Sequence, residues 1–470
     1  MARELVLGAL ATMSPALFAN AWSHPLSDTA GFATLPHWQR MARVVEAAGF
    51  DFLFFADSPS YSMAGDRIPD AVVEEGVNFP THDPIPTVAA LAATVPRLAF
   101  GVTASTTLEA PVMHARRFTT LDHLTEGRVG WNIVNSDMQH ALVRLHGLRD
   151  ITPHGERYDR ADEFMSVMYE LWEASWEDGA VLFDKATRRF AEPSKVHRVR
   201  HDGKYFSVDG LFPAIPSPQR TPVLLQAGSS SRGIAFAGEH AEIVFAQEAA
   251  IDRAADFVSR LRAAALAAGR SPHSLAVINS LSVVVGDTEQ EARRLRRELR
   301  DTPSTATMAA GFLAWTGIDL LSLPPSSTLN GIVSDYGQGT LAHYQGEDAP
   351  TVADILDGLR DTIGGFKVTG TPESVARQLE EIVDGSDLDG FMVEETFGGP
   401  EPYEEFGRRV VPLLRRDGYL PDQPRNGTFR ERLPGSTGAR LSGDHPGARR
   451  RRPETGSTRA DALNEGIANR

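Results

Sequence analysis

The sequence predicts one α/β domain built on a closed (β/α)8 TIM barrel with insertions. Eight short apolar segments recur along the 470 residues, and helical patterns separate them. The second apolar segment, residues 52–56, is continuously hydrophobic, which is typical of a parallel strand that is covered on both faces. Alternation of strands and helices indicates a parallel sheet, and the count of eight favours a closed barrel over an open sheet.

The predicted strands are identified by β-branched and aromatic residues bounded by turn residues. The fourth, Gly127-Arg-Val-Gly-Trp-Asn-Ile-Val-Asn-Ser136, begins at a Glu-Gly turn, where glycine can take a positive φ. The eight expected strands are residues 5–10, 52–56, 98–103, 127–136, 222–227, 242–246, 276–285 and 390–393.

The predicted helices have apolar residues three or four positions apart. Gly49 ends the first helix, and Pro111 begins the third one within its first turn. Thr371 provides an N-cap for the helix that precedes the last strand. The expected helices cover residues 35–48, 85–95, 111–124, 158–176, 251–268, 288–300, 371–383 and 402–414, with a further short helix ending at 240.

We assign residues 1–425 to the barrel, with insertions at about 58–84, 181–216 and 301–370. The second insertion contains a strand-like segment at 204–208. The third is rich in Gly, Pro, Ser and Thr, so it is either an excursion over the barrel mouth or a mobile loop. Residues 426–470 form a C-terminal extension, in which the basic run 449–452 resembles a solvated tail, and we expect disorder beyond about 453.

Composition excludes several classes of function. The chain has no cysteine, which excludes disulfides, thiolate nucleophiles and Cys-ligated metal clusters. A net charge of -15 disfavours nucleic acid or an anionic membrane as the main partner. The apolar run at residues 5–10 is too short for a signal peptide, and no segment approaches the about 20 apolar residues of a membrane span. We therefore expect a soluble, cytoplasmic protein.

Asn132 is the informative residue of the fourth strand, because it places an amide within an otherwise apolar segment. Burial of this amide without partners would cost on the order of 1–3 kcal/mol. Either other protein groups satisfy Asn132, or it faces a ligand that has polar atoms.

Other polar residues cluster where the predicted strands end. In parallel barrels these ends meet at one face, where ligands bind. Each residue alone could instead cap a helix or bond to a loop. The strand-end residues are Asp57, Ser58, Thr103, Ser105, Thr106, Thr107, Asn132, Asn135, Ser136, Gln226, Gly228, Ser229, Ser230, Glu394 and Glu395.

The segment Gly228-Ser229-Ser230-Ser231 joins a predicted strand to a helix and resembles a phosphate cradle. Free backbone N–H groups at a helix start favour an anion, although the same pattern also occurs as a plain helix cap. The segment 337–342 imitates a dinucleotide-binding loop, but no convincing strand precedes it, so we discard it. The histidines lack metal-ligand spacing, and no metal site is expected.

The fourth strand resembles the corresponding signature of luciferase-like flavin-dependent monooxygenases, in the family of nitrilotriacetate monooxygenase and dibenzothiophene-sulfone monooxygenase. That family usually has Thr-Ser where this chain has Asn135-Ser136. The family also has Trp-Arg-His-Pro, whereas this chain has Ser23 in place of the arginine. Further similar segments follow in the family's order from about residue 5 to about 450: 21–25, 54–58, 157–163, 226–230 and 428–433.

The resemblance implies a bacterial luciferase-like barrel that binds FMN, and it assigns candidate positions in this sequence. Asp57 and Thr103 would lie beside the flavin ring, although Ser105 or Thr106 could take the place of Thr103, and Asn132 would lie near the ring. His154 and Tyr158, four residues apart at a helix start, would face the phosphate or ribityl side. The remaining expected contacts are Ser136, Gly228, Ser229 and Ser230, with the two serines of the cradle at the phosphate.

The implied reaction is oxygenation of a small organic substrate by O2 and reduced FMN (FMNH2), often with cleavage of a C–N or C–S bond. A separate NAD(P)H:flavin reductase would supply FMNH2, and the chain would form a homo-oligomer, either a dimer or a tetramer. His154 is the candidate catalytic proton carrier, while Arg67, Phe79 and His82 could contact substrate. Two alternatives remain: a deazaflavin-dependent oxidoreductase on the same barrel, and a flavin-binding protein without catalysis.

Overall fold

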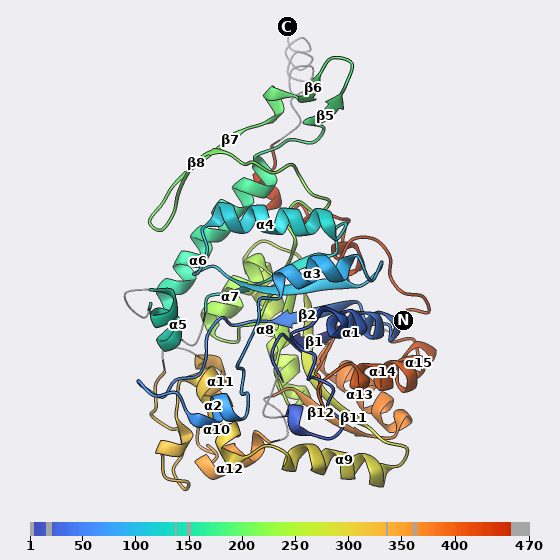
Figure 1. Cartoon of the computed structure of the whole chain (residues 1–470). Helices are drawn as coiled ribbons and strands as arrows, with labels where there is room; N and C mark the ends of the chain where they lie inside the picture. The colour runs from blue at the N-terminus through green and yellow to red at the C-terminus, as the bar shows by residue number, and fades with distance from the viewer. Residues whose placement is uncertain are drawn as a thin grey trace.

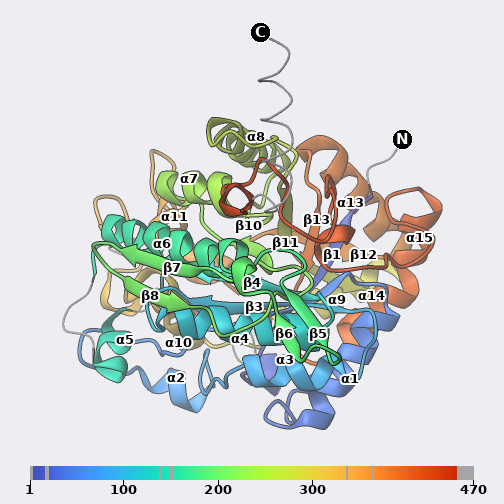
Figure 2. The ribbon, with the colours of Figure 1, turned by 90° about the horizontal axis from the view of Figure 1, so that it is seen from above.

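The computed structural model describes residues 4–15, 21–136, 139–147, 152–334, 337–360 and 364–452. Eight parallel strands close a barrel (Figures 1 and 2), and the last strand pairs with the first. The predicted fold class is therefore confirmed. In order around the barrel the strands are β1 (Val6–Thr12), β2 (Phe52–Ala56), β3 (Ala99–Ser105), β4 (Val129–Val134), β9 (Val223–Gln226), β10 (Ile243–Ala246), β11 (Ala276–Val285) and β13 (Gly390–Val393).

Helices cover the outside of the barrel, and a large apolar core fills the space between them and the strands. Trp131 on β4 points into this outer core, with its ring centroid 5.8 Å from that of Phe118. The predicted helices are confirmed, with ends that differ by a few residues. They are α1 (Leu35–Ala47), α3 (Ile85–Ala92), α4 (Pro111–Leu124), α6 (His154–Tyr169), α7 (Ser231–His240), α8 (Ile251–Ala267), α9 (Glu289–Asp301), α13 (Pro372–Ser386), α14 (Glu401–Arg409) and α15 (Val411–Arg416).

A second, smaller core fills the interior of the barrel toward the end at which the strands begin. Alternate residues of the strands point inward, and Phe54 meets Phe245 across the lumen with ring centroids 4.6 Å apart. Gly130 makes room for this packing, because a Cβ there would lie 2.9 Å from Phe429 Cε1. The inward residues include Val6, Phe52, Val223, Leu225, Ile243, Ile278 and Met392.

The second insertion forms an arm of two antiparallel hairpins that extends from the barrel (Figure 1), namely β5 (Val181–Asp184) with β6 (Arg189–Ala191), and β7 (Arg198–Asp202) with β8 (Ser207–Leu211). The strand predicted at 204–208 is wrong in its position, since the strand begins only at Ser207. Residues 203–206 form the turn instead, because the carboxylate of Glu163 accepts the backbone N–H groups of Tyr205 and Phe206.

The described part of the third insertion is a small helical unit with its own core, made of α10 (Thr305–Thr316), α11 (Gln338–Ala342) and α12 (Val352–Gly358). Helix α10 packs on α2 (Asp70–Glu74) of the first insertion, and Figure 1 shows these four helices together. The insertion ends in β12 (Phe366–Gly370), a ninth parallel strand that pairs with the second half of β11. This strand was not predicted, because five residues next to glycines carry only a weak strand pattern.

Residues 426–452 pack against the base of the barrel, the end at which its strands begin. Phe429 is fully buried against Phe52, with ring centroids 5.1 Å apart, and its N–H donates to Gly127 O at 2.8 Å. The boundary at residue 425 remains a prediction, and the tail expected to be disordered lies outside the described residues. Within the described ranges, no helix is long and apolar enough to cross a membrane.

Candidate functional site

The neighbouring strands β3 and β4 bring two polar side chains together at the upper end of the lumen. Thr103 and Asn132 are register partners, and Asn132 Nδ2 donates to Thr103 Oγ1 at 2.9 Å. Thr103 Oγ1 in turn donates to Phe55 O at 2.9 Å, which fixes both side chains. The buried Asn132 Oδ1 has no hydrogen-bond partner within the described structure. Because buried polar atoms are normally satisfied, this oxygen is a candidate acceptor for a ligand N–H or O–H.

The opposite wall of the lumen carries a buried carboxyl group. Ser280 on β11 donates to Glu394 Oε1 at 2.6 Å, and burial raises the pKa of Glu394 to about 7. The adjacent Glu395 accepts the N–H of Gly399 at 2.6 Å, and its pKa is raised by burial to about 8. The sequence pointed to both glutamates as strand-end residues but missed Ser280, although a hydroxyl within an apolar strand is the same signal that singled out Asn132.

Asp57 follows β2 at the same end of the barrel and is partly buried. Burial and the nearby charge of Asp83 raise the pKa of Asp57 to about 7, although hydrogen bonds from the Ser58 N–H and the Thr81 side chain oppose the shift. Its carboxyl group can therefore exchange a proton near neutral pH.

The segment between β9 and α7 packs closely against the hydroxyl of Tyr158. Ser230 caps α7 by accepting the N–H of Gly233 at 3.1 Å. A Cβ on Gly233 would lie 2.9 Å from the Tyr158 hydroxyl, and one on Gly228 would overlap the amide of Gln226. Neighbouring side chains occupy the space that a Cβ would take at both positions, so glycine allows this close packing. The N-terminal end of α7 and the serine hydroxyls are suited to a phosphate group.

His154 and Tyr158 approach this loop from α6. The helix begins at His154, earlier than the predicted start at 158, so the two residues share a face and their ring centroids are 5.2 Å apart. Tyr158 is buried against Phe236, and the guanidinium of Arg232 lies 5.3 Å from the centre of its ring. Arg232 also forms an ion pair with Asp162 and lies 3.7 Å from Asp159, so these carboxylates compensate its charge beside the loop.

Ser136 ends the segment after β4 in the left-handed region, with φ of 56°. Its hydroxyl is hydrogen-bonded to that of Ser105, which connects the tips of β3 and β4. Asn132 pairs with Leu225 on β9, so the loop that begins at Gly228 leaves the barrel beside it. The residues predicted for the site therefore lie at one end of the barrel.

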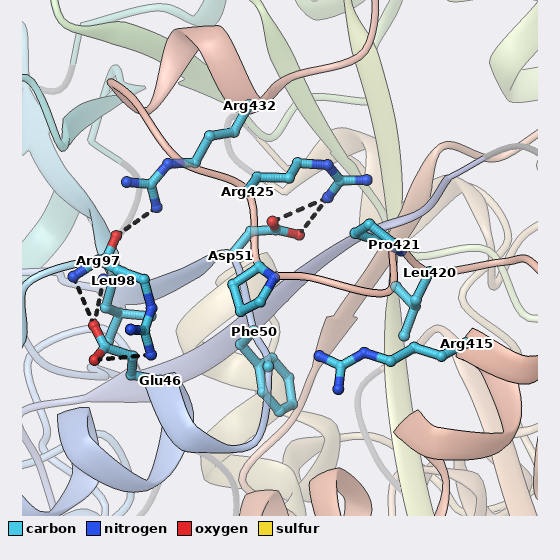
Figure 3. Close-up of a pocket in the computed structure, with 12 residues that line it drawn as sticks. Glu46, Phe50, Asp51, Arg97, Leu98, Arg415, Leu420, Pro421, Arg425 and Arg432 are labelled. Carbon is cyan, nitrogen blue, oxygen red and sulfur yellow. Dashed lines mark hydrogen bonds and ion pairs between the residues drawn. The ribbon is translucent and has the colours of Figure 1, made fainter.

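A cavity lies at the opposite end, at the base (Figure 3). Most of its charged groups are paired: Arg425 contacts Asp51 at 3.0 Å, and Arg97 contacts Glu46 at 3.5 Å. Arg415 differs, because its buried Nε has no acceptor among the described residues. Arg425, through Asp51, and Arg432, which donates to Arg97 O, hold the C-terminal segment against the base.

Comparison with known proteins gives the class to which this barrel belongs. The model of the family described as luciferase-like monooxygenase matches residues 15–387. A dimethyl-sulfide monooxygenase from Hyphomicrobium sulfonivorans is 38% identical over 438 residues, which cover 92% of this chain and 90% of that protein. A crystal structure of riboflavin lyase with modified FMN and riboflavin has 37% identity and a TM-score of 0.91, covering 96% of this chain and 100% of the other.

The chain belongs to the luciferase-like monooxygenase family. A dibenzothiophene-sulfone monooxygenase from Rhodococcus erythropolis is also 32% identical over 422 residues, covering 88% of this chain and 92% of that one. The resemblance found in the sequence is thereby confirmed, as is the enzyme class of flavin-dependent monooxygenase. The family implies a flavin, and the buried Asn132 Oδ1, which has no partner within the described structure, fits a hydrogen-bond donor of such a group.

Proposed function

We propose that this protein is the oxygenase component of a two-component monooxygenase that uses FMNH2 and O2. One observation carries the proposal: a buried acceptor without a partner, Asn132 Oδ1, lies on the strand next to the one that leads into the glycine-serine loop. A flavin mononucleotide has polar ring atoms that can donate to Asn132 Oδ1 and a phosphate that the glycine-serine loop can hold. The deazaflavin alternative receives no comparable support, because two of the relatives reported above are named monooxygenases and the third, a riboflavin lyase, was crystallised with a modified FMN.

Each predicted residue keeps one role in this proposal. Asp57, Thr103 and Asn132 contact the ring, and Ser136 stiffens the adjoining strand tips through Ser105. His154 and Tyr158 contact the ribityl or phosphate portion. The phosphate is held by the loop residues Gly228, Ser229 and Ser230, whose hydroxyls and backbone N–H groups are donors.

Bound FMNH2 would supply the electrons that activate O2, and the protein would orient it and exclude water. The apolar lumen beneath Asn132 keeps water from one side of the site. A proton could be carried at the imidazole of His154. Asp57 and Glu394 are further proton-exchanging groups, since the pKa of each is raised to about 7.

The substrate is proposed to be a small organic compound whose C–S or C–N bond is cleaved. Support for the C–S case comes from two relatives, which are named for dimethyl sulfide and a sulfone. The first and third insertions border the mouth and are the proposed substrate walls, with Arg67, Phe79 and His82 as candidates. An NAD(P)H:flavin reductase supplies FMNH2, and assembly into a homodimer or homotetramer is to be checked by light scattering.

An anaerobic titration of the purified protein with FMNH2 tests the proposal. We expect saturable binding of one FMNH2 per chain. Addition of a flavin reductase, NADH and O2 should then consume a member of a panel of sulfides and sulfones. Absence of FMNH2 binding would refute the proposal. Turnover of a reduced deazaflavin without O2 would instead support the second hypothesis, and flavin binding without any O2-dependent turnover would support the third.

A further inference from the structure

The cavity at the base is lined by more positive than negative groups. Its charged residues are four arginines and two acidic residues, namely Arg97, Arg415, Arg425, Arg432, Glu46 and Asp51. The lining therefore carries an excess of two positive charges, in a chain whose net charge is -15. Positive charge gathered in a partly enclosed cavity attracts an anion, because the surrounding protein screens the charge less than water does.

Both carboxylates of the lining already have partners. Glu46 accepts two backbone N–H groups, at 2.7 and 2.8 Å, and lies 3.5 Å from the guanidinium of Arg97. Asp51 accepts the N–H of Leu7 at 2.9 Å and contacts Arg425 Nη1 at 3.0 and 3.1 Å. Figure 3 marks the hydrogen bonds and ion pairs among the lining residues, and none of them reaches the guanidinium of Arg415.

Arg415, on α15, is the cation that these contacts leave unbalanced. Its buried Nε has no hydrogen-bond acceptor among the described residues. The other two arginines of the C-terminal segment differ, because Arg425 donates to Leu5 O at 3.1 Å and Arg432 donates to Gly427 O at 2.7 Å. A buried donor without an acceptor is unfavourable, so the cavity favours a ligand that accepts this hydrogen bond and carries negative charge.

The guanidinium of Arg415 is held at the wall of the cavity by close packing. Gly49 follows α1 with φ of 89°, and a Cβ there would lie 2.7 Å from Arg415 Nη2. The guanidinium therefore lies against the backbone of the glycine. Phe50, the next residue, is buried and lies beside the guanidinium in Figure 3. The donor is thus positioned before any ligand arrives.

We propose that this cavity binds one small monovalent anion of the size of chloride, which accepts the N–H of Arg415 Nε. The free space in the cavity is about 20 Å³, whereas one water molecule needs roughly 10–15 Å³. A monatomic anion fits this space, and a phosphate that carries a sugar does not. The site is therefore distinct in size and place from the proposed flavin site at the other end of the barrel, and the inference does not depend on the proposed function.

The proposed anion would stabilise the docking of the C-terminal segment. The wall of the cavity combines the end of α1, the residues directly before β3, and residues 415–432. These three parts are distant in the sequence and meet only in the folded chain. An anion that binds the folded chain alone raises its stability as the anion concentration rises.

Thermal unfolding in sodium chloride and in sodium gluconate of equal ionic strength gives the first test. Gluconate is too large for the cavity. At about 300 mM salt, replacing gluconate by chloride should raise the melting temperature of the wild type by roughly 2–4 °C more than that of Arg415→Gln. Arg416→Gln is the matched control, because Arg416 is exposed and paired with Asp417, and its loss changes the net charge equally. It should respond to chloride as the wild type does, and an equal chloride response in all three proteins would overturn the proposal.

A wild-type crystal soaked in bromide gives the second test, and it does not depend on the folding of a variant. Bromide replaces chloride and scatters X-rays anomalously, so its position can be observed directly. We expect an anomalous peak in hydrogen-bond contact with Arg415 Nε. Anomalous peaks confined to exposed side chains elsewhere would show an adventitious ion only and would contradict the proposal.

Discussion

The two ends of the barrel differ in which buried polar atoms lack partners, since amide oxygens are unpaired at the mouth, whereas at the base the guanidinium Nε of Arg415 is unpaired within the described structure. At the base, Arg430 makes two hydrogen bonds to Glu242, at 2.6 and 2.9 Å, and Arg128 donates to the carbonyls of Val95 and Leu98. At the mouth, Asn132 Oδ1 and Gln226 Oε1 are buried without partners among the described residues.

This difference separates stability from function. Strands begin at the base, where the C-terminal segment fills the lumen with Phe429 and pairs the charges around it. Strands end at the mouth, where a buried acceptor without a partner is suited to a ligand that donates a hydrogen bond. Substitutions at the base should therefore change the free energy of unfolding, and those at the mouth should change flavin binding.

The largest expected effect is on stability, from Phe429→Ala at the base. Removal of a fully buried phenyl ring should lower the free energy of unfolding by about 3–5 kcal/mol. Urea unfolding measures this loss, and the folded fraction should bind FMN as tightly as the wild type. A weaker FMN affinity at unchanged stability would break the division between the two ends.

Asn132→Leu, at the mouth, should weaken FMN binding and leave stability nearly unchanged. FMN affinity should fall roughly 10- to 100-fold, or about 1.4–2.7 kcal/mol, while stability changes by less than about 1 kcal/mol, because the lost amide was only half satisfied. Asn279→Leu is the contrasting variant, since both polar atoms of Asn279 are hydrogen-bonded to Glu248 backbone atoms. It should lose stability and retain FMN affinity, and equal FMN losses in both variants would contradict the assignment.

Glu394→Gln is an exception at the mouth, because the buried carboxyl group should also alter how stability depends on pH. The pKa of Glu394 is raised from 4.5 to about 7, so its neutral form is favoured in the folded state. The neutral carboxyl group contributes its full stabilisation of the fold below pH 4.5, and this contribution is lost as the pH rises through 7. At pH 8 the variant should therefore be more stable than the wild type, by on the order of 1–3 kcal/mol, with little difference at pH 4.5. Thermal melts at the two pH values measure the change, and parallel pH profiles would disprove it.

The smallest effect is expected for Arg415→Ala at the base. This arginine is partly exposed and its Nε lacks an acceptor, so its removal should change stability in chloride-free buffer by less than about 0.5 kcal/mol. FMN affinity, measured by fluorescence quenching, should be unchanged. A loss of FMN binding would show that the cavity of Figure 3, and not the mouth, receives the anion.

The sequence predicted the barrel well because strong local patterns repeat in it. Each core strand carries its own apolar signal, and residues 127–136 also carry the family signature. The predicted ends of the elements were less accurate. Helix α6 begins at His154, directly after Pro153. The prediction missed this first turn because the turn has no apolar periodicity of its own. The strand β12 depends on pairing with β11, which is a tertiary contact that five residues cannot encode.

The candidate site was predicted in part, and the missing parts come from distant segments. Thr103, Asn132 and the loop at Gly228 could be identified as polar positions at strand ends, because each lies within or next to a strand that the sequence predicts. The approach of Gly339 to Ser229 joins segments 110 residues apart, so no local pattern could reveal it. The same holds for the pairing of Ser280 with Glu394 across two strands.

A crystal structure of the protein soaked with FMN tests the central claim most directly, because it locates the flavin at one end of the barrel or the other. We expect the phosphate within hydrogen-bond distance of Ser229, Ser230 and the Tyr158 hydroxyl, with Asn132 Oδ1 facing a donor of the flavin. FMN bound in the arginine-lined cavity at the base, with the mouth empty, would contradict the account.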